Sequence, residues 1–156
     1  MKALVVSALF LLTASALLAA DDTAEAIVQR QLEAYNAHDI DAFVATYADD
    51  VQLFELPDKV LMRGAAQLRE RYAERFRDTL LHADIVNRIA IGDTVVDHER
   101  VRLTLPQGPS TVEAIAIYQV RDGKIINVWF RRGEPNATNH KGQEVRGPSG
   151  VRLLVC

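Results

Sequence analysis

The chain has 156 residues, of which 49% are hydrophobic and 25% charged, a composition typical of one globular domain with its own core. The formal net charge of −3 and the lack of a lysine-rich or arginine-rich block argue against nucleic acid, whose phosphates call for a basic face. We therefore expect no nucleic-acid partner and favour a small neutral or apolar molecule.

Residues 1–20 have the pattern of a secretory signal peptide. One lysine precedes an uncharged apolar run from Ala3 to Ala20, and small residues stand before two aspartates. A retained membrane anchor is the alternative, because the uncharged run is almost long enough to span a bilayer. We expect cleavage near Ala20 and no stable membrane insertion afterwards.

The single cysteine, Cys156, is the last residue, so it forms no internal disulfide. Export without a disulfide fits a bacterial periplasm or a secreted bacterial product better than a small animal ectodomain. The sequence thus predicts a periplasmic or secreted protein.

Three helices are predicted in the first half of the chain. The first opens at Asp22 in capping-box spacing with Glu25 and has an apolar stripe. The second is capped by Asp39 and buries Ile40, Phe43, Val44 and Tyr47. The third starts at Gly64 and places Leu68, Tyr72 and Phe76 at intervals of four.

Strand periodicity dominates the second half. One strand, "VQLFELP", lies between the second and third helices, and four period-two runs follow from about His82, separated by turn sequences such as Asp-Gly. This order predicts an α+β fold in which a curved antiparallel sheet wraps around three helices. We expect the domain to span residues 21–132 and residues 133–156 to form a loose polar tail.

Glu55 is the first candidate for chemistry. A two-residue period places it on the same strand face as Val51 and Leu53. If this face is the core, desolvation raises the carboxyl pKa towards neutrality, where a glutamate can exchange protons. If the face is wet, Glu55 is an ordinary solvated charge.

The segments "AIVQRQLEAYNAHDIDAFVATYADDVQLFE", "RGAAQLRERYAERF" and "IYQVRDGKIINVWF" resemble the SnoaL-like, nuclear-transport-factor-2-like superfamily, which includes ketosteroid isomerases, polyketide cyclases and scytalone dehydratase. The resemblance covers about residues 22–132. It implies a cone-shaped, cystatin-like roll closed by helices around an apolar pocket, commonly paired into dimers. It implies the fold more strongly than the activity.

The resemblance also assigns positions. The isomerase base lies five residues beyond the second aspartate of "ADD", which is Glu55 here. The two oxyanion-hole positions, a tyrosine and an aspartic acid in those isomerases, correspond to Gln31 and Ala116. A glutamine amide can donate a hydrogen bond to a developing enolate, whereas an alanine methyl cannot.

The strand "VVDHERVRLT" has two possible registers. One turns His98 and Arg100 into the cone, where either residue can pair with Glu55. The other turns Val95, Val101 and Leu103 inward, and pattern alone slightly favours it because more apolar residues share that face.

The remaining aromatic residues are expected at the core or the pocket wall, with ligand-contacting positions at Tyr35, Tyr47, Tyr72, Phe76 and Phe130. Trp129 alternates away from Phe130, so we place it on the outer sheet as part of a homodimer surface. Adjacent strand residues Asp97, His98 and Glu99 point to alternating faces, so we expect no metal site, and no cofactor.

Two functions remain open. The first is an exported, cofactor-independent enzyme of the isomerase, cyclase or dehydratase type, with Glu55 as base and His98 and Gln31 assisting, acting on a small apolar carbonyl compound. The second is a non-catalytic ligand carrier or association module on the same scaffold.

Overall fold

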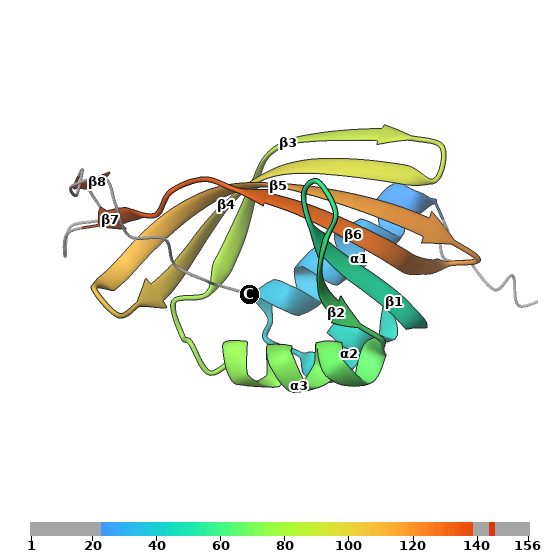
Figure 1. Cartoon of the computed structure of the whole chain (residues 1–156), viewed down its shortest axis with the longest axis horizontal. Helices are drawn as coiled ribbons and strands as arrows, with labels where there is room; N and C mark the ends of the chain where they lie inside the picture. Colours follow the sequence, from blue (N-terminus) through green and yellow to red (C-terminus); the bar gives the residue numbers. More distant parts are fainter. Residues whose placement is uncertain (1–22, 139–143, 146–156) are drawn as a thin grey trace, which may run out of the picture.

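The computed structural model describes residues 23–138 and 144–145. The predicted signal peptide and Cys156 lie outside the described residues. Figure 1 shows the arrangement of three helices and eight strands: α1 (Ala24–Asn36), α2 (Ile40–Ala45), β1 (Tyr47–Glu55), β2 (Lys59–Arg63), α3 (Ala65–Arg75), β3 (His82–Ile91), β4 (Thr94–Leu105), β5 (Gly108–Arg121), β6 (Lys124–Arg132), β7 (Asn136–Thr138) and β8 (Glu144–Val145).

The helices begin at side-chain or glycine caps. Thr23 caps α1 by accepting a hydrogen bond from the amide of Ala26 over 3.2 Å, so the cap is one residue later than predicted. Asp39 caps α2 as predicted, accepting from the amides of Asp41 and Ala42. The predicted extension of α2 to Tyr47 is wrong, because the helix ends at Ala45 and Tyr47 begins β1.

Gly64 is the N-cap of helix α3, and its φ of 82° is a conformation that glycine adopts without strain. Its predicted apolar positions pack inward: Leu68 is fully buried, and Tyr72 lies with its ring centroid 4.5 Å from that of Phe43 in α2. Phe76, just after the helix, meets the Phe43 ring edge-on at 5.4 Å. An aromatic cluster therefore joins α2 to α3.

The sheet has the strand order β2-β1-β6-β5-β4-β3, with β7 and β8 added beyond β5. All neighbours are antiparallel except β1 and β6, which pair in parallel, so the sheet is mixed rather than wholly antiparallel. β1 and β6 are far apart in the chain, so no short hairpin fixes their relative direction. The predicted α+β fold, with a curved sheet against three helices, is confirmed.

Three strands were not predicted. β2 returns along β1 after the turn at Pro57, and only Met62 of its side chains is buried, so it has little apolar periodicity. β7 pairs with β5 and β8 with β7, so these parts of the tail are not loose.

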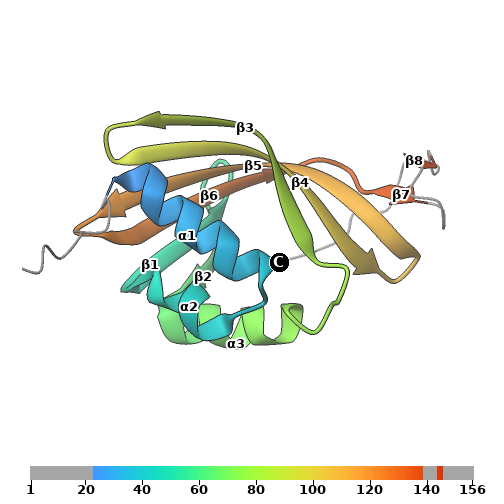
Figure 2. The ribbon, with the colours of Figure 1, turned by 180° about the vertical axis from the view of Figure 1, so that it is seen from behind.

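The helices lie on one side of the sheet, as Figure 2 shows, with α1 running across the concave face. The core fills the space between them, and its fully buried members include Ile27, Phe43, Leu53, Val95 and Val128. The inward faces of the central strands therefore all line one shared interior.

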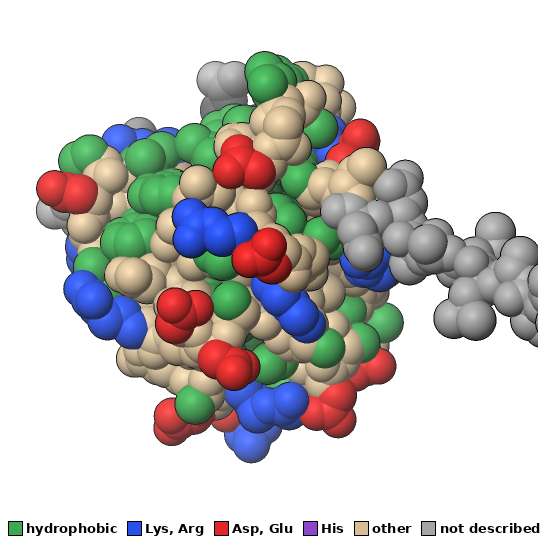
Figure 3. Space-filling model, turned by 90° about the vertical axis from the view of Figure 1, so that its right-hand side faces the viewer, with side chains coloured by type: hydrophobic (Ala, Val, Ile, Leu, Met, Phe, Trp, Pro, Cys, Tyr) green, Lys and Arg blue, Asp and Glu red, His purple; other side chains and the backbone are tan. Residues whose placement is uncertain are grey.

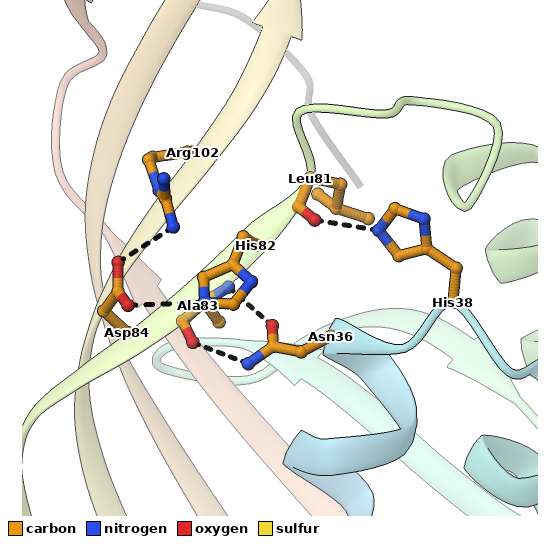
Figure 4. A network of polar contacts seen from close by, with 7 residues as sticks. All are labelled: Asn36, His38, Leu81, His82, Ala83, Asp84 and Arg102. Carbon is orange, nitrogen blue, oxygen red and sulfur yellow. Dashed lines mark hydrogen bonds and ion pairs between the residues drawn. The ribbon is translucent and has the colours of Figure 1, made fainter. Parts of the chain in front are cut away.

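The end of α1 is tied to the start of β3 (Figure 4). The Asn36 side chain donates to the carbonyl of Ala83 over 2.9 Å and accepts from its amide over 2.8 Å. Nε2 of His38 lies 2.8 Å from the carbonyl oxygen of Leu81. These contacts give Asn36 and His38, within the "NAHD" run, a structural role that fixes the helix against the sheet.

The surface in Figure 3 carries acidic and basic side chains among hydrophobic ones, with no patch of a single sign on the visible face. Among residues 23–138 and 144–145, no helix is long and apolar enough to cross a membrane.

Candidate functional site

A cavity of about 290 Å³ lies between α1, α3 and the inner face of the sheet. Much of its wall is apolar, from residues on α1, β2, β4, β5 and β6: Leu32, Met62, Val101, Leu103, Val112, Ala114 and Phe130. A space of this size and lining holds a small organic molecule.

The register of β4 decides which polar groups enter this cavity. Val95, Val101 and Leu103 are buried. The strand therefore adopts the register that turns these apolar residues inward, which the sequence pattern slightly favoured. Asp97 and Glu99 share this face and are buried with 1% and 8% of their surface exposed. Two carboxyl groups, rather than His98 and Arg100, therefore point inward.

Glu99 lies in the cavity wall, and its Oε1 accepts a hydrogen bond from the hydroxyl of Tyr118 over 3.0 Å. Burial raises the pKa of Glu99 to about 7, although the Tyr118 hydrogen bond opposes the shift. The nearby Asp97 carboxylate adds to the increase. Near neutrality Glu99 therefore exists in both protonation states, as a general acid and base requires.

Asp97 holds a buried ion pair on the same strand face. Arg88 of β3 binds it through two hydrogen bonds of 2.7 Å, and Arg88 also donates to Oε1 of Gln29 in α1 over 2.9 Å. The pairing raises the pKa of Arg88. Asp97 is thus fully engaged with its partner, which leaves Glu99 as the buried acid that lines the cavity.

Four tyrosines line the cavity: Tyr35, Tyr47, Tyr72 and Tyr118. Burial raises the pKa of Tyr35 to about 12 and moves the pKa values of the other three in the same direction. All four therefore stay protonated at neutral pH. Phenol hydroxyls in a cavity wall are donors for an oxygen that gains negative charge.

Gln31 lies in the cavity wall as the resemblance implied and is 6% exposed. Its side chain lies close enough to Tyr47 to oppose the rise that burial causes in the pKa of that phenol. The amide thus belongs to a polar wall together with the tyrosines.

Arg75, the last residue of α3, brings a positive charge to the cavity. Its Nε donates to the hydroxyl of Tyr35 over 3.3 Å. Burial alone would lower the pKa of Arg75, but interaction with Tyr35 and Tyr72 outweighs burial and raises it.

Glu55 contributes to the lining from the rim, where its side chain is 38% exposed. Lys59 Nζ donates to Glu55 Oε2 over 3.1 Å, and this hydrogen bond lowers the pKa of Glu55. The buried environment considered for Glu55 is not formed, because it is the last residue of β1 and lies where the cavity opens.

Several other predicted site residues lie elsewhere. His98 and Arg100 point away from the cavity and bind the two carboxylate oxygens of Glu113 over 3.0 and 2.9 Å, so neither pairs with Glu55. Ala116 is buried opposite Asp97 and Phe130 but outside the cavity lining. Phe76 packs in the aromatic cluster beside it.

Sequence reasoning missed Glu99, Tyr118 and Arg75 as site residues. The signal for Glu99 was present, since an acid alternating with Val95, Val101 and Leu103 is the same pattern that singled out Glu55. Within the described part of the chain no group of three or more acidic, histidine or cysteine side chains is arranged to hold a metal ion.

Comparisons with known proteins agree with this architecture. A family model described as a SnoaL-like domain matches residues 28–128. A search of curated proteins gives no significant match.

Three solved structures illustrate the likeness. A cystatin-fold protein from Novosphingobium aromaticivorans is 25% identical, with a TM-score of 0.65 over 70% of this chain and 98% of that one. An LEH-like epoxide hydrolase from M. tuberculosis is 18% identical, with a TM-score of 0.61 over 70% and 82% of the two chains.

The third, the epoxide hydrolase/cyclase-like enzyme SalBIII of salinomycin pyran ring formation, is 19% identical, with a TM-score of 0.63 over 70% and 90%. At these identities the two enzymes show a shared fold alone. The family match covers well over half of the chain and ends inside β6, so the chain belongs to the SnoaL-like domain family.

Proposed function

We propose that this protein is an enzyme that moves a proton within a small carbonyl compound, with Glu99 as the acid and base. The observation that carries the proposal is the placement of Glu99: a carboxyl with a pKa of about 7, held by Tyr118, in the wall of a cavity lined by both polar and apolar side chains. The enzyme neighbours of the same fold support a catalytic use of such a cavity.

The proposed step needs no cofactor. The Glu99 carboxylate removes a proton from the carbon beside the substrate carbonyl, the C–H electron pair forms a C=C bond, and the carbonyl oxygen becomes an enolate. Where a C=C bond adjoins that α-carbon, the enolate is a dienolate, and the protonated Glu99 returns the proton to its γ-carbon. The C=C bond moves into conjugation with the carbonyl, so the net change is an isomerisation. Proton transfer of this kind is favoured when the pKa of the base lies near the working pH.

Tyr72 is the proposed donor to the enolate oxygen. Its ring lines the cavity, its raised pKa keeps the hydroxyl protonated, and within residues 23–138 the hydroxyl has no hydrogen-bond partner. A single well-placed donor of this type contributes about 3 kcal/mol of transition-state stabilisation. Tyr72 would thus provide the hydrogen-bond donor that Ala116 cannot.

The alternative function is non-catalytic ligand binding in the same cavity. It is favoured by Ala116, because the corresponding position in ketosteroid isomerases carries the second oxyanion donor. In a carrier, Glu99 and Tyr118 would bind a polar group of the ligand without transferring protons.

The experiment compares Glu99→Gln with Glu55→Gln. Exchange of the α-hydrogens of cyclohexanone and phenylacetone with D2O is followed by proton NMR. We expect the wild-type protein to accelerate exchange, Glu99→Gln to abolish the acceleration, and Glu55→Gln to retain it. If Glu55→Gln abolishes the acceleration and Glu99→Gln retains it, Glu55 is the base. If the wild-type protein does not accelerate exchange, the result favours the non-catalytic carrier.

We also propose that the protein is exported, on the pattern of residues 1–20. N-terminal sequencing of protein recovered from the periplasm or medium should begin at or near Asp21. Intact Met1 in a membrane fraction would contradict export with cleavage.

A further inference from the structure

Arg75 is a cation of the cavity wall without an acidic partner. Within residues 23–138 it forms no ion pair, and its one hydrogen bond runs from Nε to the Tyr35 hydroxyl over 3.3 Å. The two acids nearest along the chain have other partners: Glu74 pairs with Arg77. Asp78, whose charge also raises the pKa of Arg75, accepts hydrogen bonds from Thr104 and from the amide of Leu80, at 2.6 to 3.0 Å.

Arg75 lies close enough to Glu99 for its charge to lower the pKa of that carboxyl. Glu99 accepts from Tyr118, and no ion pair joins it to Arg75. An arginine has five N–H donors in a planar fork, and Tyr35 takes only the one on Nε. The terminal nitrogens of Arg75, on a half-buried side chain that lines the cavity, remain available to a ligand.

We propose that the ligand of this cavity carries a carboxylate, which the guanidinium of Arg75 binds while the rest of the molecule extends towards Glu99. This inference rests on the proposed function, since it names the class of molecule on which Glu99 acts. The substrate is then a small carbonyl-containing acid rather than a neutral apolar compound.

A carboxylate fits the site better than other anions. Two parallel N–H donors of a guanidinium match the two oxygens of a carboxylate in one plane. Three arginines line the cavity: Arg75 ends α3, whereas Arg131 and Arg132 end β6, with the Arg132 guanidinium over the ring of Phe130 at 5.3 Å.

The test uses matched ligands that differ only in charge: cinnamate against cinnamamide, and cyclohexanecarboxylate against cyclohexanecarboxamide. Binding is measured by ligand-observed NMR titration at pH 6, below the pKa of Glu99 of about 7, so that repulsion from an ionised Glu99 is small. We expect the wild-type protein to bind each acid at least about tenfold more tightly than its amide.

Arg75→Gln should remove this preference, and Arg75→Lys, which keeps the charge but loses the fork, should retain part of it. The matched control is Arg77→Gln, because Arg77 lies two residues further on and forms an exposed pair with Glu74. If Arg75→Gln does not fold, the wild-type comparison and Arg75→Lys still decide the question.

The outcomes separate this inference from the proposed function. Equal binding of acid and amide by the wild-type protein, or an unchanged preference in Arg75→Gln, would overturn the carboxylate inference alone. A preference retained in Glu99→Gln, together with no exchange of the α-hydrogens of a keto acid such as levulinate in the wild-type protein, would leave the carboxylate inference standing and remove the proposed catalysis. Binding of neither member of each pair would overturn both.

Discussion

The hydroxyl of Tyr118 on β5 donates a hydrogen bond to Oε1 of Glu99 on β4, over 3.0 Å, inside the fold. The two residues lie on inward faces of neighbouring strands, and α1 and α3 close the space in front of them. The contact stabilises the ionised form of a carboxyl that burial otherwise disfavours.

Tyr118→Phe should raise the pKa of Glu99 above its value of about 7, because the variant removes a hydrogen bond to the carboxylate. We also expect a loss of about 1 kcal/mol in the free energy of unfolding. Urea melts over a pH series measure both effects. The midpoint pH of the Glu99-dependent stability change should be higher in Tyr118→Phe than in the wild-type protein. An equal or lower midpoint would contradict the assigned role of Tyr118.

Glu99→Gln should remove a pH-dependent part of the stability. The folded pKa of about 7 exceeds the ordinary value of 4.5, so the folded state binds this proton more tightly than the unfolded chain. The resulting stabilisation is fully present below about pH 4.5 and is lost as the pH rises to about 7. It amounts to about 3 kcal/mol at 1.4 kcal/mol for each pKa unit.

Urea melts of the wild-type protein and Glu99→Gln at pH 4.5 and pH 8 test this expectation. From pH 4.5 to pH 8, the free energy of unfolding of the wild-type protein should fall by about 3 kcal/mol more than that of the variant. Parallel pH profiles would show that Glu99 does not carry a raised pKa.

Arg88→Met should destabilise the fold by about 3–5 kcal/mol, because it leaves Asp97 charged and buried without its partner. Asp97 is 1% exposed in this pair. The matched control is Arg69→Met, which breaks an exposed ion pair with Asp41 and should cost less than about 1 kcal/mol. Chemical denaturation measures the free energy of unfolding of both variants. Equal losses would show that the buried ion pair stabilises the fold no more than the exposed one.

The outer face of the sheet should form a homodimer interface. Six apolar side chains in register cross it from β2 to β3: Val60, Phe54, Trp129, Ile117, Val96 and Ile89. Phe54 and Trp129 stack at its centre, with ring centroids 5.5 Å apart. A contiguous apolar row on a sheet face is typical of a protein interface.

Light scattering at micromolar concentration should therefore give the mass of a dimer, and Trp129→Ser should shift it to that of a monomer. Leu80→Ser is the control, since Leu80 is 46% exposed but lies in the loop after α3, away from this face. A monomeric wild-type protein would contradict the expectation.

Sequence reasoning predicted most of the fold because the decisive signals are local. Asp39 caps α2 through its own side chain, and each of β3 to β6 combines a period-two pattern with a turn sequence. β2 was missed because a five-residue strand with one buried side chain has no such pattern.

The candidate site was harder to predict because burial at the end of a strand depends on distant elements. Glu55 and Glu99 have the same local pattern, an acid alternating with aliphatic residues. Glu99 lies in mid-strand beneath α1 and α3, whereas Glu55 ends β1 at the rim, within reach of Lys59. No local rule separates these environments, because the packing of the helices creates them.

The most direct test of the central claim is a carbon-13 NMR titration of the Glu99 carboxyl in the wild-type protein, assigned by its absence in Glu99→Gln. We predict an apparent pKa near 7, with Glu55 titrating below its ordinary value in the same spectra. A Glu99 resonance that titrates near 4.3, the value of a solvated glutamate, would contradict the claim that this residue exchanges protons in the cavity.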